Sequence, residues 1–212
     1  MKSVLLEPLK VGALELKNRV IMAPLTRLRG TVDHKPTAVM ADYYAQRAGA
    51  GLIISEGTPV SPMGVGYAQV PGIWSQEQTE LWKPVTEAVH AAGGRIFAQI
   101  WHVGRVSDPV FLHGAQPVSS SAIAPEGTVT LLRPKKEFDT PRALSTDEVK
   151  AVVEAFRRSQ EGNTCRRDMC AYIDGGLSKV GVNWFKAFSS DRIEELILAS
   201  LRIARKSKAP WE

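Results

Sequence analysis

Apolar residues in this chain gather in short continuous runs. Runs rich in Ile, Val and Leu that are each followed by a helical pattern are typical of buried strands in a parallel sheet. Three runs have this character, at residues 20–26, 52–57 and 95–102. The runs predict the strands of an α/β fold, with helices between them.

Helical spacing of apolar residues follows each run, and the helix starts carry recognisable signals. Pro36 stands at the first position of the first predicted helix. Residues 75–78 and 145–148 have the spacing of a capping box. Pro84 lies inside the second helix and predicts a kink or a short break there. The three helices are predicted over residues 36–47, 75–92 and 145–158. Alternation of strand and helix predicts right-handed βαβ units and a parallel sheet.

The segments outside this alternation are a hairpin and two long loops. Residues 5–17 predict a hairpin around Gly12, because Leu14 and Leu16 alternate with charged neighbours. The loop over residues 58–74 is long enough to suggest a function. A second long excursion, over residues 103–142, has no helical period.

Polar residues end two of the predicted strands, and chemistry in parallel α/β folds is found at strand ends. They are Thr26 and Arg27 after the first run, and Gln99, Trp101, His102 and Arg105 in and after the third. Gln99 needs a partner, because an unpaired buried amide costs about 1–3 kcal/mol. Thr26 taken alone is compatible with an ordinary strand-end hydroxyl. His102 is interpreted as structural, bonded to neighbouring backbone, and Arg105 as either a loop anchor or a ligand contact.

Composition and charge exclude several classes of protein. The 212 residues are 44% hydrophobic and 23% charged, as in globular domains. The net charge of +5 is spread along the chain without a basic stripe interleaved with aromatic residues, which argues against nucleic-acid binding. No apolar run is long enough for a signal peptide or a membrane span. We therefore expect a cytoplasmic protein that binds neither nucleic acid nor membranes.

Candidate metal ligands and phosphate-binding loops are weak. Cys165 and Cys170 have no companion cluster of Cys or His, so no metal site is predicted. Three other histidines, His34, His90 and His113, are interpreted as solvated. The glycines of residues 64–66 open no helix, which argues against a dinucleotide-binding fingerprint.

Four segments resemble the N-terminal part of the old yellow enzyme family, which are FMN-dependent ene-reductases built on a TIM barrel. The segments are residues 16–27, 43–57, 66–73 and 98–105. They fall in the family's order and spacing, and the resemblance covers about residues 4–158. Bacterial N-ethylmaleimide reductases and plant oxophytodienoate reductases share the motif seen here as Ile-Trp-His at residues 100–102.

The resemblance implies roles for residues at each strand end. Cofactor contacts are implied for Pro24, Leu25, Thr26, Gly57 and Gln99, and substrate-pocket contacts for Trp101 and Arg105. The Thr26 hydroxyl would donate a hydrogen bond to flavin O4 and tune the reduction potential. Gly57 would let the backbone approach the ring, since a Cβ would intrude. The Gln99 amide would suit the O2 and N3 edge of the flavin.

The same resemblance implies the reaction. A reduced nicotinamide, NADH or NADPH, would pass hydride to FMN, and FMN would pass it to the β-carbon of a small electron-poor alkene. Substrate polarisation by a His/His or His/Asn pair lowers the barrier in this family, and a Tyr donates the proton. We find neither group in this sequence, nor the Arg and Gly-rich segments that hold the flavin phosphate. No catalytic residue is assigned, and we expect a truncated, catalytically impaired chain with weak flavin affinity.

The family pattern ends inside the fourth βα unit. Residues 159–168 are polar, and residues 169–173 make a poor substitute for the expected apolar strand. We therefore predict an incomplete TIM (β/α)8 barrel of about three to four βα units with an N-terminal hairpin, over residues 1–158. Residues 159–212 are predicted as an unrelated tail that ends in an amphipathic helix from about Asp191.

An incomplete barrel would leave the first and third strands as open edges. Two chains could pair these edges as a homo-oligomer, or the terminal helix could cover part of the surface. Two other interpretations stay open: a half-barrel module that assembles with another chain, and a nonfunctional fragment.

Overall fold

A four-stranded parallel sheet forms the centre of the fold. The structure is a computed structural model that describes residues 3–11, 14–161 and 170–173. The strands lie in chain order: β3 (Ile21–Met22), β4 (Leu52–Pro59), β5 (Ile96–Trp101) and β8 (Cys170–Ile173). All three neighbouring pairs are parallel, and the described sheet is open. The predicted α/β class is confirmed, and the sheet has the strand order expected for part of a (β/α)8 barrel.

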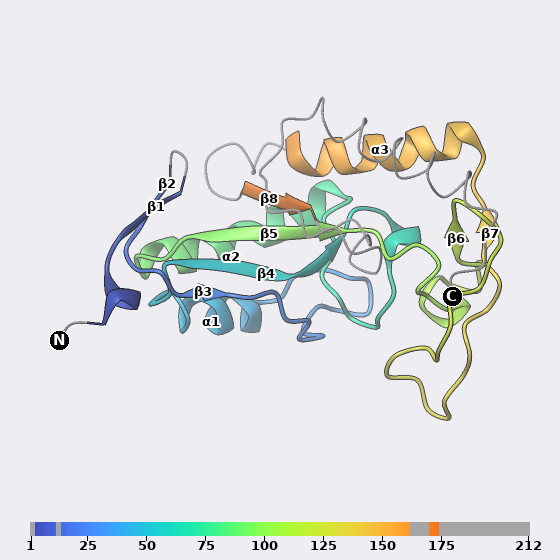
Figure 1. The fold of residues 1–212 in the computed structure, drawn as a ribbon, viewed down its shortest axis with the longest axis horizontal. Helices are drawn as coiled ribbons and strands as arrows, with labels where there is room; N and C mark the ends of the chain where they lie inside the picture. Colours follow the sequence, from blue (N-terminus) through green and yellow to red (C-terminus); the bar gives the residue numbers. More distant parts are fainter. Residues whose placement is uncertain (1–2, 12–13, 162–169, 174–212) are drawn as a thin grey trace.

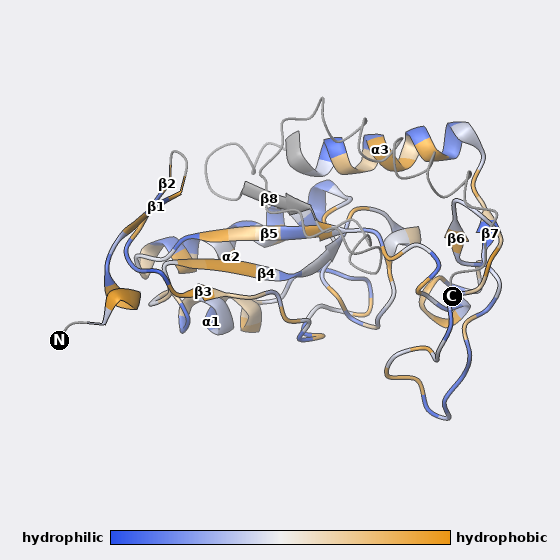
Figure 2. Ribbon diagram, in the orientation of Figure 1, coloured by the Kyte–Doolittle hydropathy of each residue, from blue (hydrophilic) through white to orange (hydrophobic). Residues whose placement is uncertain are grey.

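The helices α1 (Ala38–Ala45), α2 (Gln76–Ala91) and α3 (Thr146–Glu161) cover one face of the sheet. In Figure 1, α1 lies below β3, α2 behind β4 and β5, and α3 above β8. The core contains side chains from all three helices, among them Tyr44, Trp82 and Phe156, and packs on the sheet face that carries Ile53 and Ile96. Figure 2 shows β4 and β5 as hydrophobic at their amino ends and more hydrophilic toward their carboxyl ends, and an alternation of hydrophilic and hydrophobic residues along α3.

A hairpin covers part of the opposite face. Strands β1 (Leu9–Val11) and β2 (Leu14–Leu16) are antiparallel, as predicted, and follow a 3-10 turn at Val4–Leu6. Leu16 is buried with Leu52 and Ile54 on the sheet face turned away from the helices. Since Leu52 begins β4, the hairpin lies at the amino end of the strands and leaves the carboxyl ends to the long loops.

The fourth strand corrects the expectation that the family pattern offers none. Cys170–Ile173 pairs with β5 in a parallel register from Phe97↔Cys170 to Ile100↔Ile173. Four residues of apolar type suffice, because a strand needs only one neighbour to pair with at the edge of a sheet. The edges of the described sheet are therefore β3 and β8, and β5 is an inner strand. The amphipathic helix predicted from Asp191 lies outside the described residues.

The first strand is shorter than predicted. Only Ile21 and Met22 pair with β4, although the apolar run continues to Thr26. Pro24 has no N–H to give to a ladder, and the chain after it turns so that the Arg27 N–H meets the Glu56 side chain. Residues 23–28 therefore carry no strand ladder and depend on other contacts.

The capping boxes are confirmed. At the start of α2, Ser75 Oγ accepts from the Gln78 N–H, and Gln78 Oε1 accepts from the Ser75 N–H at 3.2 Å. At the start of α3, Ser145 Oγ accepts from the Glu148 N–H at 3.2 Å, and Glu148 Oε2 accepts from the Ser145 N–H at 2.8 Å. The first helix begins at Ala38, two residues after Pro36, with Thr37 at its N-cap.

The predicted break at Pro84 is absent, because α2 runs unbroken from Gln76 to Ala91. Pro84 stands on the exposed side of the helix, as does Glu80, whose carbonyl loses its helical donor. Exposure lets solvent satisfy that carbonyl. No helix in the described part of the chain is long and apolar enough to cross a membrane.

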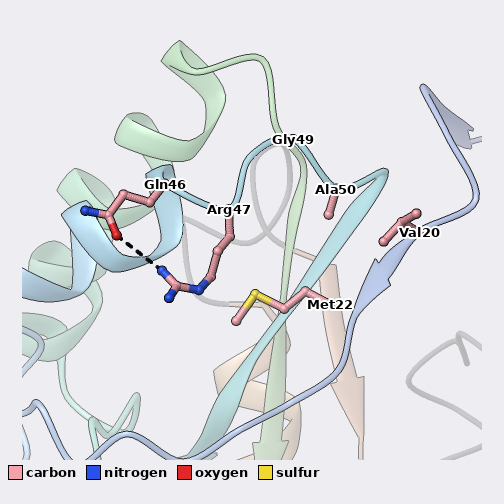
Figure 3. Close-up of a pocket in the computed structure, with 6 residues that line it drawn as sticks. All are labelled: Val20, Met22, Gln46, Arg47, Gly49 and Ala50. Carbon is pink, nitrogen blue, oxygen red and sulfur yellow. Dashed lines mark hydrogen bonds between the residues drawn. The ribbon is translucent and has the colours of Figure 1, made fainter. Parts of the chain in front are cut away.

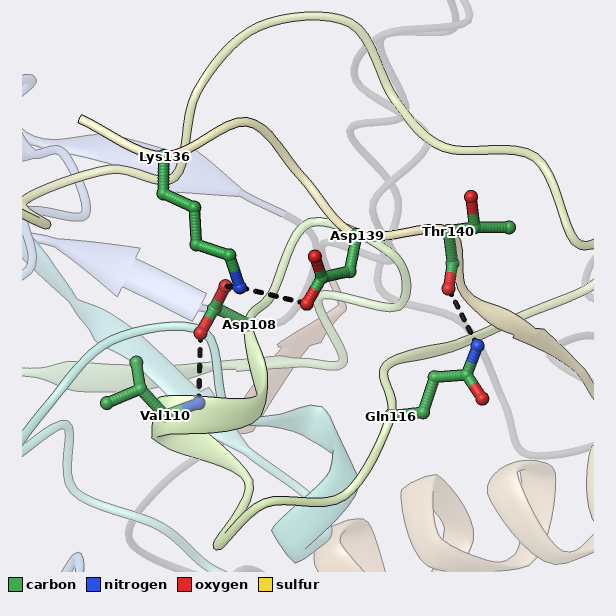
Figure 4. Close-up of polar contacts among 6 residues, drawn as sticks. All are labelled: Asp108, Val110, Gln116, Lys136, Asp139 and Thr140. Carbon is green, nitrogen blue, oxygen red and sulfur yellow. Dashed lines mark hydrogen bonds and ion pairs between the residues drawn. The ribbon is translucent and has the colours of Figure 1, made fainter.

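Polar contacts hold the long excursion after β5 in place (Figure 4). Lys136 Nζ lies 2.6 Å from Asp108 Oδ2 and 2.9 Å from Asp139 Oδ2. Gln116 Nε2 donates to the Thr140 carbonyl at 2.8 Å. The excursion also contains a 3-10 turn at Pro109–Phe111, and its strand β6 (Val118–Ser119) pairs with β7 (Arg142–Ala143). Residues 103–142 are thus an ordered loop with local pairings.

Candidate functional site

The register of β4 and β5 brings the predicted strand-end residues together. Gly57 lies opposite Gln99, and Pro59 lies opposite Trp101. Alternation along β5 places Phe97, Gln99 and Trp101 on the face away from the helices, since Ile96, Ala98 and Ile100 belong to the helix-side core. Gly57 and Gln99 therefore share this inner face at the carboxyl end of the sheet.

Trp101 covers the backbone at Gly57. A Cβ built on Gly57 would lie 2.5 Å from the Cδ2, Cε2 and Cε3 atoms of the indole. The indole also stacks on Tyr67, with ring centroids 5.9 Å apart and planes at 22°. The inner face at Gly57 thus accepts a flat aromatic ring at van der Waals distance, and only Gly provides that space.

A hydrogen bond from its backbone N–H attaches Gln99 to strand β4. Its N–H donates to Ser55 Oγ at 3.1 Å, at the point where the β4–β5 register shifts between Ile54 and Gly57. Gln99 as a residue is buried, with 7% exposure. A register shift of this kind changes the direction in which the side chains at a strand end point.

Thr26 and its neighbours lie in the segment that follows β3. Pro24 and Thr26 are half-buried and Leu25 is exposed. The next residue, Arg27, donates its N–H to Glu56 Oε2 at 3.1 Å, and Glu56 directly precedes Gly57. The chain of Thr26 is thereby attached to the strand that carries Gly57.

Arg105 holds a loop. Its guanidinium Nη1 donates to the Ile123 carbonyl at 3.0 Å. This bond joins the start of the long excursion over residues 103–142 to its middle. It is an anchoring contact within the loop, and the role of Arg105 as a ligand contact stays a prediction.

Glu56 and Tyr44 were missed by reasoning from the sequence. Glu56 is 1% exposed in a strand whose eight residues are all buried. Its Oε1 accepts from the Tyr44 hydroxyl at 3.2 Å, and burial raises the pKa of this carboxyl. Burial also raises the pKa of Tyr44. An acid two residues after the apolar run of residues 52–54, inside a buried strand, was the signal that could have identified the pair.

The His102 imidazole accepts a hydrogen bond at one of its two ring nitrogens. Nδ1 accepts from the Gly104 N–H at 3.1 Å, which assigns the proton to Nε2. Nε2 is buried and has no hydrogen-bond partner among the described residues, and neither do Trp101 Nε1 and Ser61 Oγ. Burial lowers the pKa of His102 to about 4. The interpretation of His102 as bonded to neighbouring backbone is confirmed.

We predict that His102→Asn flattens the pH dependence of stability between about pH 6.5 and pH 4. The unfolded chain protonates this histidine below its ordinary pKa of 6.5, whereas the folded chain holds it neutral down to about 4. Folding stability of the unsubstituted chain therefore falls as the pH falls through this window, by about 2–3 kcal/mol from this group.

Urea unfolding at several pH values measures this effect, and the exposed His113→Asn is the matched control. Some slope remains in His102→Asn, because burial lowers the pKa of His34 as well. Equal slopes in His102→Asn and the unsubstituted chain would contradict the assignment.

His34 corrects the interpretation that it is solvated. It is 8% exposed, and its Nδ1 lies 2.9 Å from the Val70 carbonyl. Its carbonyl accepts from Gln78 Nε2 at 3.2 Å, which ties the loop before α1 to the start of α2. The sequence hid this role, because Val70 and Gln78 are remote in the chain. His113 is exposed and His90 is half-buried.

A shallow hollow of about 440 Å³ lies at the other end of the sheet (Figure 3). Its lining residues are Val20, Met22, Gln46, Arg47, Gly49 and Ala50. Val20 and Ala50 precede β3 and β4, so the hollow lies at the amino ends of these strands. The hollow is thus separate from the strand-end residues Gly57 and Gln99. No cluster of His, Cys, Asp or Glu that could hold a metal ion occurs in the described ranges.

Comparison with known proteins decides the family. The NADH:flavin oxidoreductase / NADH oxidase family matches residues 4–169, which is most of the chain. The chain belongs to this family. Among solved structures, the old yellow enzyme homologue from Zymomonas mobilis aligns at a TM-score of 0.70 and 49% identity, over 74% of this chain and 44% of that one. Morphinone reductase in complex with tetrahydroNAD aligns at a TM-score of 0.74 and 38% identity, over 95% and 61%.

Curated relatives in this old yellow enzyme family are reductases. A putative 12-oxophytodienoate reductase 2 of Oryza sativa subsp. japonica is 46% identical over 159 residues, which cover 73% of this chain and 40% of the relative. A chanoclavine-I aldehyde reductase of Penicillium roqueforti is 42% identical over 176 residues, 81% of this chain and 44% of the relative. The chain thus spans about 40% of the length of the curated relatives it matches.

The family uses FMN. The described residues offer one feature that suits a flavin ring: a flat aromatic ring, the Trp101 indole, already packs against the bare Cα of Gly57. The indole Nε1 has no hydrogen-bond partner among the described residues, so a ring that took its place would break only the stack of the indole on Tyr67.

Proposed function

We propose that this chain forms the flavin-ring side of an FMN site in an old yellow enzyme-type oxidoreductase. The observation that supports this most is the register that places Gly57 opposite Gln99 on the inner sheet face. Thr26 joins them from the neighbouring strand end, because Arg27 is bonded to Glu56. Membership of the family makes FMN the cofactor expected at such a strand-end arrangement.

Each residue would have a distinct task toward the ring. The Thr26 hydroxyl donates to the O4 edge, Gln99 offers a donor and an acceptor to the O2 and N3 edge, and Pro24 and Leu25 line one side. Bound FMN supplies hydride transfer from NADH or NADPH to an electron-poor alkene. Trp101 bounds the substrate side, and Arg105 fixes the loop after β5 through its bond to Ile123.

The relatives support a proposal for the substrate class. Names such as 12-oxophytodienoate reductase and chanoclavine-I aldehyde reductase belong to enzymes that act on small organic molecules. The complex of morphinone reductase with tetrahydroNAD supports a nicotinamide as reductant. We propose a small electron-poor alkene as substrate. The chain's sequence offers no His pair or proton-donor Tyr in the family's positions, so we expect slow turnover by these residues alone.

We predict that Gln99→Leu weakens FMN binding about tenfold, because it removes a donor and an acceptor at the ring edge. The backbone N–H of residue 99, which bonds Ser55, is kept by this substitution. Titration of flavin fluorescence measures the affinity. Gln46→Leu, an exposed amide at the opposite end of the sheet, is the matched control and should bind FMN like the unsubstituted chain. Equal losses in both variants would contradict the assigned role of Gln99.

A second candidate function is assembly through an open sheet edge. The outer side of β3 has no strand partner in the described residues, and Val20 and Ile21 there are 44% and 45% exposed. The hollow beside Met22 and Arg47 adjoins this edge (Figure 3). Two chains could pair at β3 as a homo-oligomer, or a complementary chain could add the next strand.

We predict that Ile21→Lys prevents assembly at this edge, because a charge on an exposed edge strand opposes strand pairing. Sedimentation velocity of the two proteins measures it. The unsubstituted chain should sediment as an oligomer and Ile21→Lys as a monomer. A monomeric unsubstituted chain would rule out self-assembly at β3.

A further inference from the structure

Glu56 is a buried acid whose side chain joins three parts of the fold. Oε2 accepts from the Arg27 N–H at 3.1 Å, and Oε1 accepts from the Tyr44 hydroxyl at 3.2 Å. Tyr44, on α1, is 0% exposed, and its oxygen also accepts from the Glu56 N–H at 2.8 Å. The carboxyl group thus bonds the chain after β3 on one oxygen and helix α1 on the other.

The segment that Glu56 holds has no strand ladder in the structure. β3 contributes only Ile21 and Met22 to the ladder, so residues 23–28 are fixed by side-chain contacts. The Arg27 N–H and the Thr26 carbonyl belong to the same planar peptide group. The bond from this N–H to Glu56 therefore fixes the orientation of the peptide group that follows Thr26. The Arg27 guanidinium lies 5.4 Å from the ring centre of Tyr43, which gives the segment a second attachment on α1.

The same residue joins the neighbouring strand end through its backbone. The Glu56 carbonyl accepts from Ser55 Oγ at 2.9 Å and from Thr58 Oγ1 at 3.0 Å. Ser55 Oγ in turn accepts from the Gln99 N–H at 3.1 Å. One continuous set of hydrogen bonds therefore runs from Arg27 through Glu56 to Gln99, across the register shift in β4.

We propose that Glu56, supported by Tyr44, is the positioning residue that holds Thr26 near Gly57 and Gln99. Glu56 thereby fixes the position of the Thr26 hydroxyl, which donates a hydrogen bond to the flavin O4 edge. Glu56 does not touch the cofactor in this proposal. It acts through the peptide after Thr26. The proposal rests on the flavin-ring site described above and extends it to the group that aligns the three strand ends.

The buried carboxyl group of Glu56 depends on its hydrogen-bond partners. A carboxyl group in an apolar strand must have its oxygens satisfied, and the loss of one partner costs more than an exposed bond would. The charged and titratable groups that face Glu56 are Arg27 from the loop after β3 and Tyr44 from α1. A pure packing role at this position would be filled better by a Leu or Ile of similar size.

The test compares Glu56→Gln with the control Glu87→Gln, an exposed acid on α2. Gln keeps one acceptor oxygen but cannot carry the carboxylate charge that strengthens the bond from the Arg27 N–H. Its NH2 group faces either that N–H, where no bond forms, or the Tyr44 hydroxyl, which can accept from it. Hydrogen exchange of the full chain without flavin is the first readout. We expect the amides of residues 26–28 to exchange about tenfold faster in Glu56→Gln, with the α2 amides nearly unchanged.

The visible spectrum of FMN added to each variant at saturating concentration is the second readout. We expect Glu56→Gln to shift the bound-flavin spectrum toward that of free FMN, and Glu87→Gln to match the unsubstituted chain. Tyr44→Phe, which keeps the ring and removes only the hydroxyl, should give a smaller change in the same direction.

Equal acceleration of exchange at residues 26–28 and throughout α2, or a bound-flavin spectrum unchanged by Glu56→Gln, would overturn the proposal and leave Glu56 as a general stabilising group. A free-flavin spectrum with the unsubstituted chain would instead remove the proposed FMN site. It would remove the cofactor role of Glu56 with it, while hydrogen exchange still reports whether Glu56 holds residues 26–28.

Discussion

Trp82→Ala is expected to lower the free energy of unfolding by about 3–5 kcal/mol, because it empties a large volume in the centre of the core. Trp82, on α2, is 0% exposed and belongs to the core that residues of α1 and the sheet also form. Its Nε1 also donates to the Gly72 carbonyl at 3.0 Å, so the substitution releases the loop that follows β4. Urea unfolding followed by far-UV circular dichroism measures the loss.

Leu81→Ala is the matched control for Trp82. Leu81 is the preceding residue of α2 and is 37% exposed, so its truncation should change the free energy of unfolding by less than about 1 kcal/mol. Similar losses for the two variants would mean that α2 does not bury the face assigned to it.

Gly57→Ala is expected to force the Trp101 indole away from the sheet. The new Cβ would lie 2.5 Å from three indole atoms, which no side chain tolerates without movement. The indole then loses its stack on Tyr67. We expect a loss of about 1–3 kcal/mol in the free energy of unfolding, as for other overpacked sites. The near-UV circular dichroism spectrum of Gly57→Ala should also lose the signal of the Trp101 indole. The variant Trp101→Phe identifies that signal, because it removes the indole.

Gly49→Ala is the control for that substitution. A Cβ on Gly49 would meet no atom within 4 Å, so this variant should keep both the stability and the near-UV signal. An unchanged near-UV signal in Gly57→Ala would contradict the position assigned to the Trp101 indole.

Local signals in the sequence were sufficient for most elements of the fold. The Ser-x-x-Gln spacing at residues 75–78 and the Ser-x-x-Glu spacing at residues 145–148 specify capping boxes that need only four neighbouring residues. The hairpin at β1 and β2 was equally local. Apolar runs located β4 and β5 within two residues, because β4 is buried throughout and four of the six residues of β5 are buried.

Elements that depend on distant partners were harder to predict. Cys170–Ile173 becomes a strand because β5 offers it an edge, which four apolar residues after a polar segment do not reveal. The end of β3 at Met22 is decided by the Arg27 bond to Glu56, a residue 29 positions away. His34 was interpreted as solvated because its partner Val70 is equally remote.

The candidate site shows the same division. Polar residues at strand ends identified Thr26, Gln99 and Trp101, and the register of β4 and β5 brings Gly57 to Gln99. The hydrogen bonds that align them pass through Glu56, Tyr44 and Ser55, which no local pattern connects. Sequence reasoning thus found residues at the strand ends and missed those whose hydrogen bonds join the strand ends together.

The visible absorption spectrum of FMN, recorded with and without the purified chain, tests the central claim most directly. The account predicts a saturable shift and sharpening of the flavin bands as chain is added, which Gln99→Leu weakens and Gln46→Leu leaves unchanged. A folded chain that leaves the spectrum of free FMN unaltered at every concentration would contradict the account.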